Sequence, residues 1–148
     1  MKIAYLCNVI VPSIAKIINE RESVFGGWLA QTIEHFAADN EILYFAPFKN
    51  NIKVQQGNIT FVGFDFVNQS LAGVFERELL EFIPNIIHIW GSEFEHSYYM
   101  SEAVGRCGMR ECTVLSLQGI ISECARVFTT GIPEKVINRW LLGDIVRG

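Results

Sequence analysis

The chain has 148 residues, of which 50% are hydrophobic and 19% are charged, and its formal net charge is −4. This length supports one domain with a sizeable core and is too short for two ordinary domains. Because phosphate backbones require a basic footprint, the acidic balance argues against nucleic acid as a partner.

The four cysteines form no metal-binding pattern. Cys107 and Cys112 are separated by four residues and no C-x-x-C motif occurs, which is a poor fit to structural zinc. The chain opens on a strand-like pattern rather than on a signal peptide, and no apolar run is long enough to cross a bilayer. We therefore expect a cytoplasmic protein with free thiols and no bound metal.

Five apolar runs predict the strands of a mainly parallel sheet. They cover residues 2–11, 41–48, 58–66, 86–90 and 113–117. Nearly continuous apolar runs next to glycine or proline are typical of strands buried on both faces. The link between the second and third runs is short, and it fits either a hairpin or a weakly structured crossover.

Helical patterns separate most of these runs. Apolar stripes at helical spacing cover residues 28–37, 71–83 and 99–107. Strands that alternate with helices predict a Rossmann-like three-layer α/β/α domain. We expect segment 13–18 to be a packing or disordered loop, with contact to an acceptor or a membrane surface as the alternative.

The last predicted helix covers residues 131–148, with Pro133 in its first turn and Trp140 on its apolar face. No strand pattern follows it. Because a doubly wound domain normally continues, we expect residues 1–148 to be a single Rossmann-like domain that is part of a longer protein.

The first candidate site is the Gly26-Gly27 pair, which follows the first strand and opens a helix. Glycines let a ligand approach the backbone closely, and the helix N-terminus favours an anion. A phosphate or a sugar hydroxyl fits this position, and so does tight packing of the helix on the sheet. The pair is not part of G-x-G-x-x-G, which disfavours a dinucleotide site.

The second candidate site is the end of the strand at 86–90, where open α/β sheets bind ligands. Its residues are Trp90, Gly91, Ser92, Glu93 and His96. Strand alternation places His88 on the same face as Trp90, and we interpret His88 as a hydrogen-bonded core residue. Glu93 and His96 fit either a functional pair or a helix-start acid beside a solvated imidazole.

The third candidate site is Gln118-Gly119, at the end of the last predicted strand. Gln118 can donate and accept hydrogen bonds toward a ligand in the same crevice, although a turn residue before glycine is the alternative. No G-x-S-x-G elbow, phosphate loop or H-E-x-x-H pair occurs, and no catalytic residue is predicted.

Four motifs, in this order, resemble the N-terminal domain of the retaining GT-B glycosyltransferases of family 4. They are Lys-Ile-Ala-Tyr-Leu at the start, the Gly-Gly pair, Pro-Asn-Ile-Ile-His-Ile-Trp-Gly and Val-Leu-Ser-Leu-Gln-Gly. The resemblance covers residue 1 to about residue 126. Asn85 and Trp90 stand where the family commonly has Asp and His. Gln118 stands where it often has His, and glutamine can still hydrogen-bond a sugar hydroxyl.

The resemblance implies two Rossmann-like domains that face each other across a cleft. The N-terminal domain mostly binds the acceptor, a glycan or a lipid-linked glycan, and the missing C-terminal domain binds the nucleotide-sugar donor. Gly26 and Gly27 would lie against the donor diphosphate or the transferred sugar. No metal or other cofactor is implied, because helix N-termini and cationic side chains stabilise the leaving diphosphate.

Two alternatives to this hypothesis stay open. One is a stand-alone ligand-binding or regulatory module, either flavodoxin-like or receiver-like. The other is a different GT-B enzyme, such as an inverting transferase or a sugar-nucleotide epimerase. For the favoured hypothesis we expect a cytoplasmic enzyme of polysaccharide or lipid-linked glycan synthesis, with peripheral contact to the inner face of the membrane as a variant.

Overall fold

The computed structural model describes residues 1–21, 27–65 and 70–117, and beyond them residues 123, 126–127, 130–133 and 135–136. The chain divides into two compact units, Met1–Gln118 and Gly119–Gly148. The fold described below is that of the first unit. Most of the helix predicted over 131–148 lies outside the described residues.

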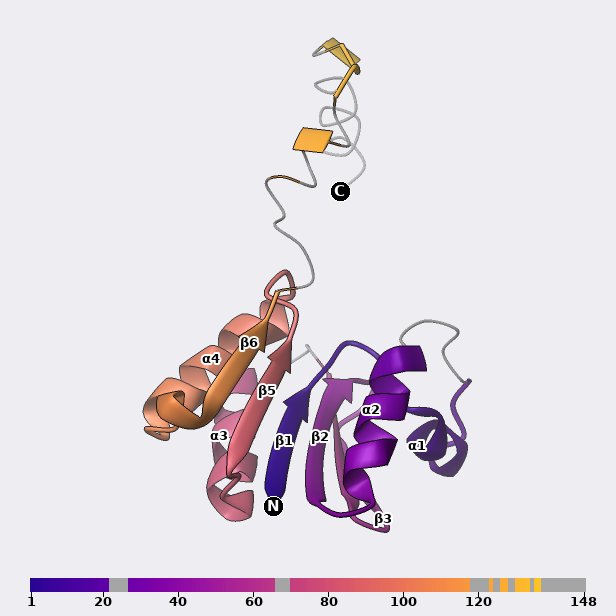
Figure 1. Ribbon diagram of the computed structural model, residues 1–148, viewed down its shortest axis with the longest axis vertical. Helices are drawn as coiled ribbons and strands as arrows, with labels where there is room; N and C mark the ends of the chain where they lie inside the picture. Colours follow the sequence, from indigo (N-terminus) through magenta and orange to yellow (C-terminus); the bar gives the residue numbers. More distant parts are fainter. Residues whose placement is uncertain are drawn as a thin grey trace. The chain divides into compact units, whose positions relative to one another are not determined.

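Six strands form one sheet in the order β3–β4–β2–β1–β5–β6 (Figure 1). Their bounds are β1 Lys2–Leu6, β2 Glu41–Pro47, β3 Ile52–Gln56, β4 Ile59–Phe64, β5 Ile86–Trp90 and β6 Thr113–Ser116. All neighbouring pairs are parallel except β3 and β4, which form an antiparallel hairpin. The predicted mainly parallel sheet is confirmed.

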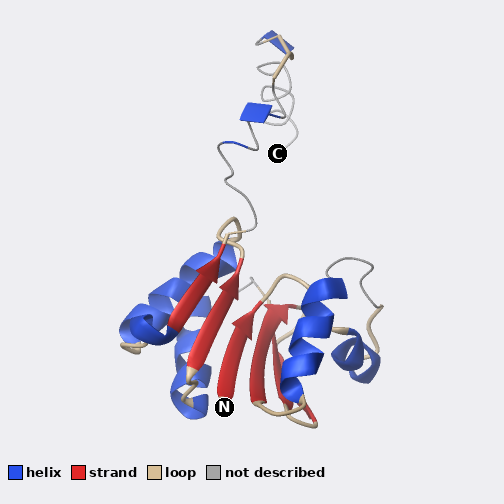
Figure 2. Cartoon of the chain, viewed as in Figure 1, coloured by secondary structure: helices blue, strands red, loops and turns tan. Residues whose placement is uncertain are grey.

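Helices cover both faces of the sheet (Figure 2). They are α1 Pro12–Ile17, α2 Gly27–Ala37, α3 Leu71–Phe82 and α4 Glu95–Arg106. One apolar cluster joins the sheet to α1 and α2, and a second joins it to α3 and α4. Because successive side chains of a strand point to opposite faces, the neighbours Tyr44 and Phe45 are fully buried in different clusters.

The prediction that the first strand extends to residue 11 is wrong, and so is the loop predicted at 13–18. Strand β1 ends at Leu6, and α1 begins at Pro12, which suits the first turn of a helix. Val11 and Ile14 are fully buried in the cluster beneath α1 and α2. The apolar run continues because a loop and a short helix also pack on the sheet, and an apolar run alone does not distinguish these cases.

The link between β2 and β4 contains a strand that the sequence analysis did not predict. Strand β3 pairs with β4 through a tight turn in which Gly57 has a φ of +56°. Neither predicted alternative therefore describes this link: it carries β3, which forms a hairpin with β4, and it does not make a hairpin of β2 and β4. Strand β2 lies parallel to β4, and β3 forms the edge of the sheet.

Candidate functional site

The carboxyl ends of β1 and β5 form the switch point of the sheet. The chain leaves β1 toward β2 on one side and returns at β5 on the other side, and ligands of open α/β sheets bind outside this point. A hollow of about 400 Å³ lies at this edge. Its described lining consists of Asn8, Pro47, Phe94, Glu95 and His96. His96, one of the predicted site residues, lines this hollow.

His96 lies in the first turn of α4 and is only 3% exposed. Its ring stacks on Phe94 at 5.1 Å with an interplanar angle of 6°, and it lies 5.6 Å from the ring of Phe64. Burial lowers the pKa of His96 to about 4, although the carboxylates of Glu93 and Glu95 act in the opposite direction. The alternative of a solvated imidazole is therefore wrong, because His96 is a buried neutral group at pH 7.

Gly91 connects the end of β5 to the exposed residues Ser92 and Glu93. Its backbone N–H donates to the Ser116 carbonyl at 2.9 Å, and its own carbonyl accepts from Ser97 Oγ at 2.7 Å. Gly91 has a φ of +90°, and a Cβ built on it would lie 2.9 Å from both carboxylate oxygens of Glu93. The Glu93 carboxylate thus folds over Gly91 at the predicted end of the sheet.

We expect Gly91→Ala to lower the free energy of unfolding by about 1–3 kcal/mol, because a φ of +90° is disfavoured for alanine, whereas the exposed Glu93 carboxylate can move aside at little cost. Urea unfolding followed by circular dichroism would measure this loss. Gly108→Ala is the matched control. Gly108 also has a positive φ, +68°, but no atom lies within 4 Å of its Cβ position. Because the φ of Gly108 lies in the left-handed region that alanine tolerates better, a loss at Gly91 no larger than that at Gly108 would contradict the prediction.

An aromatic cluster lies beside this edge on the side of α2. His88 Nε2 lies 2.7 Å from Ser116 Oγ, and burial lowers the pKa of His88. The His88 ring stacks on Trp90 at 4.2 Å, and Trp90 meets the ring of Trp28 edge-on at 4.8 Å. These contacts agree with a structural role for His88. Trp28, which is 53% exposed, was predicted only as part of a helical stripe.

The structure places only part of the predicted donor site. Gly27 is the exposed first residue of α2, and a Cβ built on it would meet no atom within 4 Å. Tight packing is therefore not the reason for glycine at position 27. Gly26, Gln118 and Gly119 lie outside the described residues.

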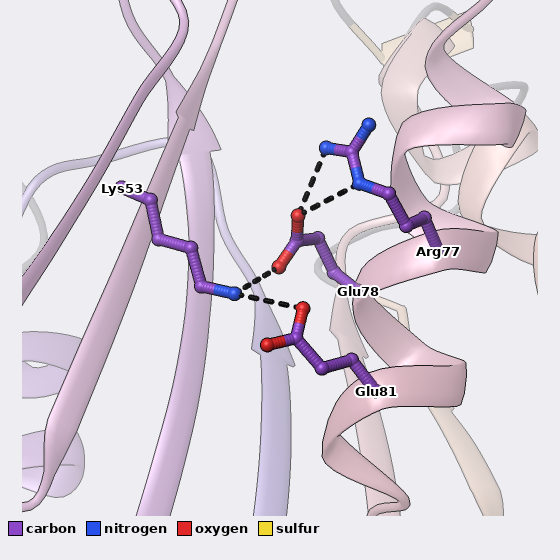
Figure 3. Close-up of polar contacts among 4 residues, drawn as sticks. All are labelled: Lys53, Arg77, Glu78 and Glu81. Atoms are coloured by element: carbon purple, nitrogen blue, oxygen red, sulfur yellow. Dashed lines mark hydrogen bonds and ion pairs between the residues drawn. The ribbon is translucent and has the colours of Figure 1, made fainter.

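A polar cluster that no sequence pattern predicts joins α3 to the edge strand β3 (Figure 3). Lys53 Nζ lies 2.8 Å from Glu78 and 3.1 Å from Glu81, and Arg77 binds the other oxygen of Glu78 at 2.9 Å. Burial acts to raise the pKa of Glu78, but hydrogen bonds from Lys53 and Arg77 more than offset it, so this pKa is lowered. Hollows of about 390 and 370 Å³ flank the Lys53–Glu78 pair.

This cluster contains the ion pair of Lys53 and Glu78, which lie 25 residues apart in the chain, so no local motif could reveal it. It ties the edge strand to α3. A lysine on an edge strand also discourages pairing between sheet edges. Among the described residues, no group of three or more His, Cys, Asp or Glu side chains could hold a metal ion. None of the helices that the structure describes has the length and apolar character needed to span a membrane.

The sequence matches no protein-family model and no curated protein. Among solved structures, it is similar to the trehalose-6-phosphate protein from E. coli bound with UDP-2-fluoro glucose, with a TM-score of 0.50 and 16% identity. The chain has a Rossmann-like α/β fold. The match covers 79% of this chain and 33% of that chain, so this chain spans about a third of its neighbour. At 16% identity, this likeness shows the fold alone.

Proposed function

We propose that this chain is the acceptor-side domain of a family 4 glycosyltransferase, which moves a hexosyl group from a nucleotide sugar to a glycan or lipid-linked acceptor with retention. The observation that carries the proposal is the likeness over 79% of the chain to a structure bound with UDP-2-fluoro glucose. The hollow at the switch point supports it, because the ligands of such sheets bind at that edge.

In this proposal the acceptor binds near the residues that follow β5. Ser92 and Glu93 are exposed and can hydrogen-bond sugar hydroxyls. Trp90 is half-buried and packs between His88 and Trp28, and Gly91 holds the turn that brings the Glu93 carboxylate over Gly91. His96 is a buried neutral wall of the neighbouring hollow, so its role is to shape the site rather than to carry charge.

The donor side of the proposal rests on the N-terminus of α2. Gly27 leaves its backbone open to a close approach, and the positive end of a helix dipole favours a diphosphate. We assign Gly26, Gln118 and Gly119 to the same donor contact by resemblance. A diphosphate leaving group stabilised in this way needs no metal ion. The other wall of the donor site would belong to a second Rossmann-like domain, and the enzyme would work in the cytoplasm, at most peripherally bound to a membrane.

The test has two arms. The longer protein that carries this domain is incubated with UDP-, GDP- and ADP-sugars and a mixture of glycan acceptors, and release of nucleoside diphosphate is measured. We expect acceptor-dependent release with at least one donor, and no release with any donor would overturn the proposal.

In the second arm, the 148-residue chain alone is titrated with the same nucleotide sugars by isothermal calorimetry. We expect no turnover and an affinity weaker than millimolar, because the nucleotide pocket would lie on the second domain. Micromolar affinity of the chain alone for a nucleotide sugar would contradict the proposal that the second domain binds the donor. It would indicate a self-contained binding module.

A further inference from the structure

Helix α2 has an apolar inner face and an aromatic outer face. Leu29, Ala30 and Ile33 are buried against the sheet, whereas Trp28 is 53% exposed and Phe36 is 41% exposed. Residues at intervals of four lie on one side of a helix, and eight residues span about 12 Å along its axis. Two large exposed rings thus lie about two turns apart on the same helix.

A shallow hollow of about 680 Å³ runs along this outer face. Its described lining is Trp28, Gln31, Thr32, Glu34, His35 and Phe36. Between the two aromatic rings the side chains offer an amide, a carboxylate and an imidazole, all of them exposed. The Thr32 hydroxyl donates to the Trp28 carbonyl at 2.8 Å, and the rings of His35 and Phe36 meet edge-on at 6.0 Å.

The chemistry of this lining fits a neutral carbohydrate. A sugar ring presents an apolar C–H face that can lie on an aromatic ring, and its hydroxyl groups can pair with amide, carboxylate and imidazole groups. A phosphate group would need cationic partners, and the described lining contains neither Lys nor Arg. A lipid chain would remove water from the polar side chains without replacing their hydrogen bonds, which is costly.

The hollow also lies next to Trp90 of the candidate site. Trp28 lines one end of it and contacts Trp90 at the end of β5 through ring centroids 4.8 Å apart. We propose that the hollow along α2 binds a neutral oligosaccharide, with sugar rings stacked on Trp28 and Phe36. A role in holding a growing glycan beside the acceptor site rests on the proposed function, whereas the binding itself does not.

The binding is tested on the 148-residue chain with maltotetraose, cellotetraose and mannotetraose as probes, by isothermal calorimetry. We expect millimolar or tighter affinity for at least one probe. Trp28→Ala and Phe36→Ala should each weaken that affinity at least about tenfold, which corresponds to about 1.4 kcal/mol, since each removes a ring on which a sugar stacks. Tyr98→Ala is the matched control, because Tyr98 is 68% exposed on α4 and does not line the hollow.

A third variant, Thr32→Arg, places a long charged side chain in the middle of the hollow and should also weaken the affinity at least about tenfold. Circular dichroism confirms that each variant is folded. Failure of all three probes to bind the wild-type chain would overturn the proposal, as would binding that survives both aromatic substitutions. A preference for a sulfated tetrasaccharide over its neutral counterpart would also contradict it. Oligosaccharide binding together with a complete lack of nucleotide-sugar turnover in the longer protein would overturn the proposed function and leave this inference standing.

Discussion

Phe75→Ala is expected to lower the free energy of unfolding by about 3–5 kcal/mol, the range for removing a large side chain from a packed core. Phe75 projects from α3 and is fully buried. Its ring meets Phe45 of β2 edge-on at 5.3 Å and Phe64 of β4 at 5.0 Å. Alanine would leave a cavity between two strands and a helix, where rigid backbone on every side limits collapse.

Urea unfolding at pH 7, followed by circular dichroism, would measure the effect of Phe75→Ala. The slope of the free energy with urea should stay unchanged, and the midpoint should fall. Leu80→Ala is the control on the same helix, because Leu80 is 53% exposed and its loss should change stability by about 0.5 kcal/mol or less. A loss below about 1 kcal/mol for Phe75→Ala would contradict the assignment of this ring to the core.

The second large effect is a loss of stability in acid that depends on His96. Burial lowers the pKa of His96 from its ordinary 6.5 to about 4. Between these two values the unfolded chain binds a proton at this residue that the folded chain does not bind. The stability that His96 contributes is therefore complete above pH 6.5, and it is lost as the pH falls toward 4. The difference between a pKa of 6.5 in the unfolded chain and about 4 in the folded chain corresponds to about 3 kcal/mol of folding stability.

Urea unfolding curves recorded at pH 7, 6, 5 and 4 would measure this dependence for the wild type, His96→Gln and His35→Gln. Since carboxylates such as Glu78 also titrate in acid, the difference between wild type and His96→Gln isolates the histidine. We expect a shallower dependence on pH for His96→Gln, and His35→Gln is the control for replacing an exposed histidine by glutamine. An NMR titration midpoint of the His96 imidazole near 6.5 would contradict the prediction.

The predictable part of the site was its place in the chain. Gly91, Ser92 and Glu93 follow the last residue of β5, so strand alternation and the rule for open α/β sheets were enough to locate them. The state of His96 was not predictable. Whether an imidazole six residues after the end of a strand is solvated depends here on the rings of Phe94 and Phe64, and Phe64 comes from a different strand.

The same limit applies to the other features that the sequence analysis missed. Strand β3 has one packed face and one polar face, and its identity as a strand depends on pairing with β4. Lys53 and Glu78 become an ion pair only because α3 lies over the hairpin. The exposed position of Trp28 follows from which face of α2 meets the sheet.

By itself, the sequence determined the fold class, because local signals specify it. Nearly continuous apolar runs identify parallel strands, and stripes at helical spacing identify α2, α3 and much of α4. Tertiary structure alone decided the protonation of His96, the Lys53–Glu78 pair and the aromatic hollow along α2. Each of these depends on groups that are distant in the chain, or on which face is covered, and the free energy of burial and pairing is set by the neighbours that folding brings together.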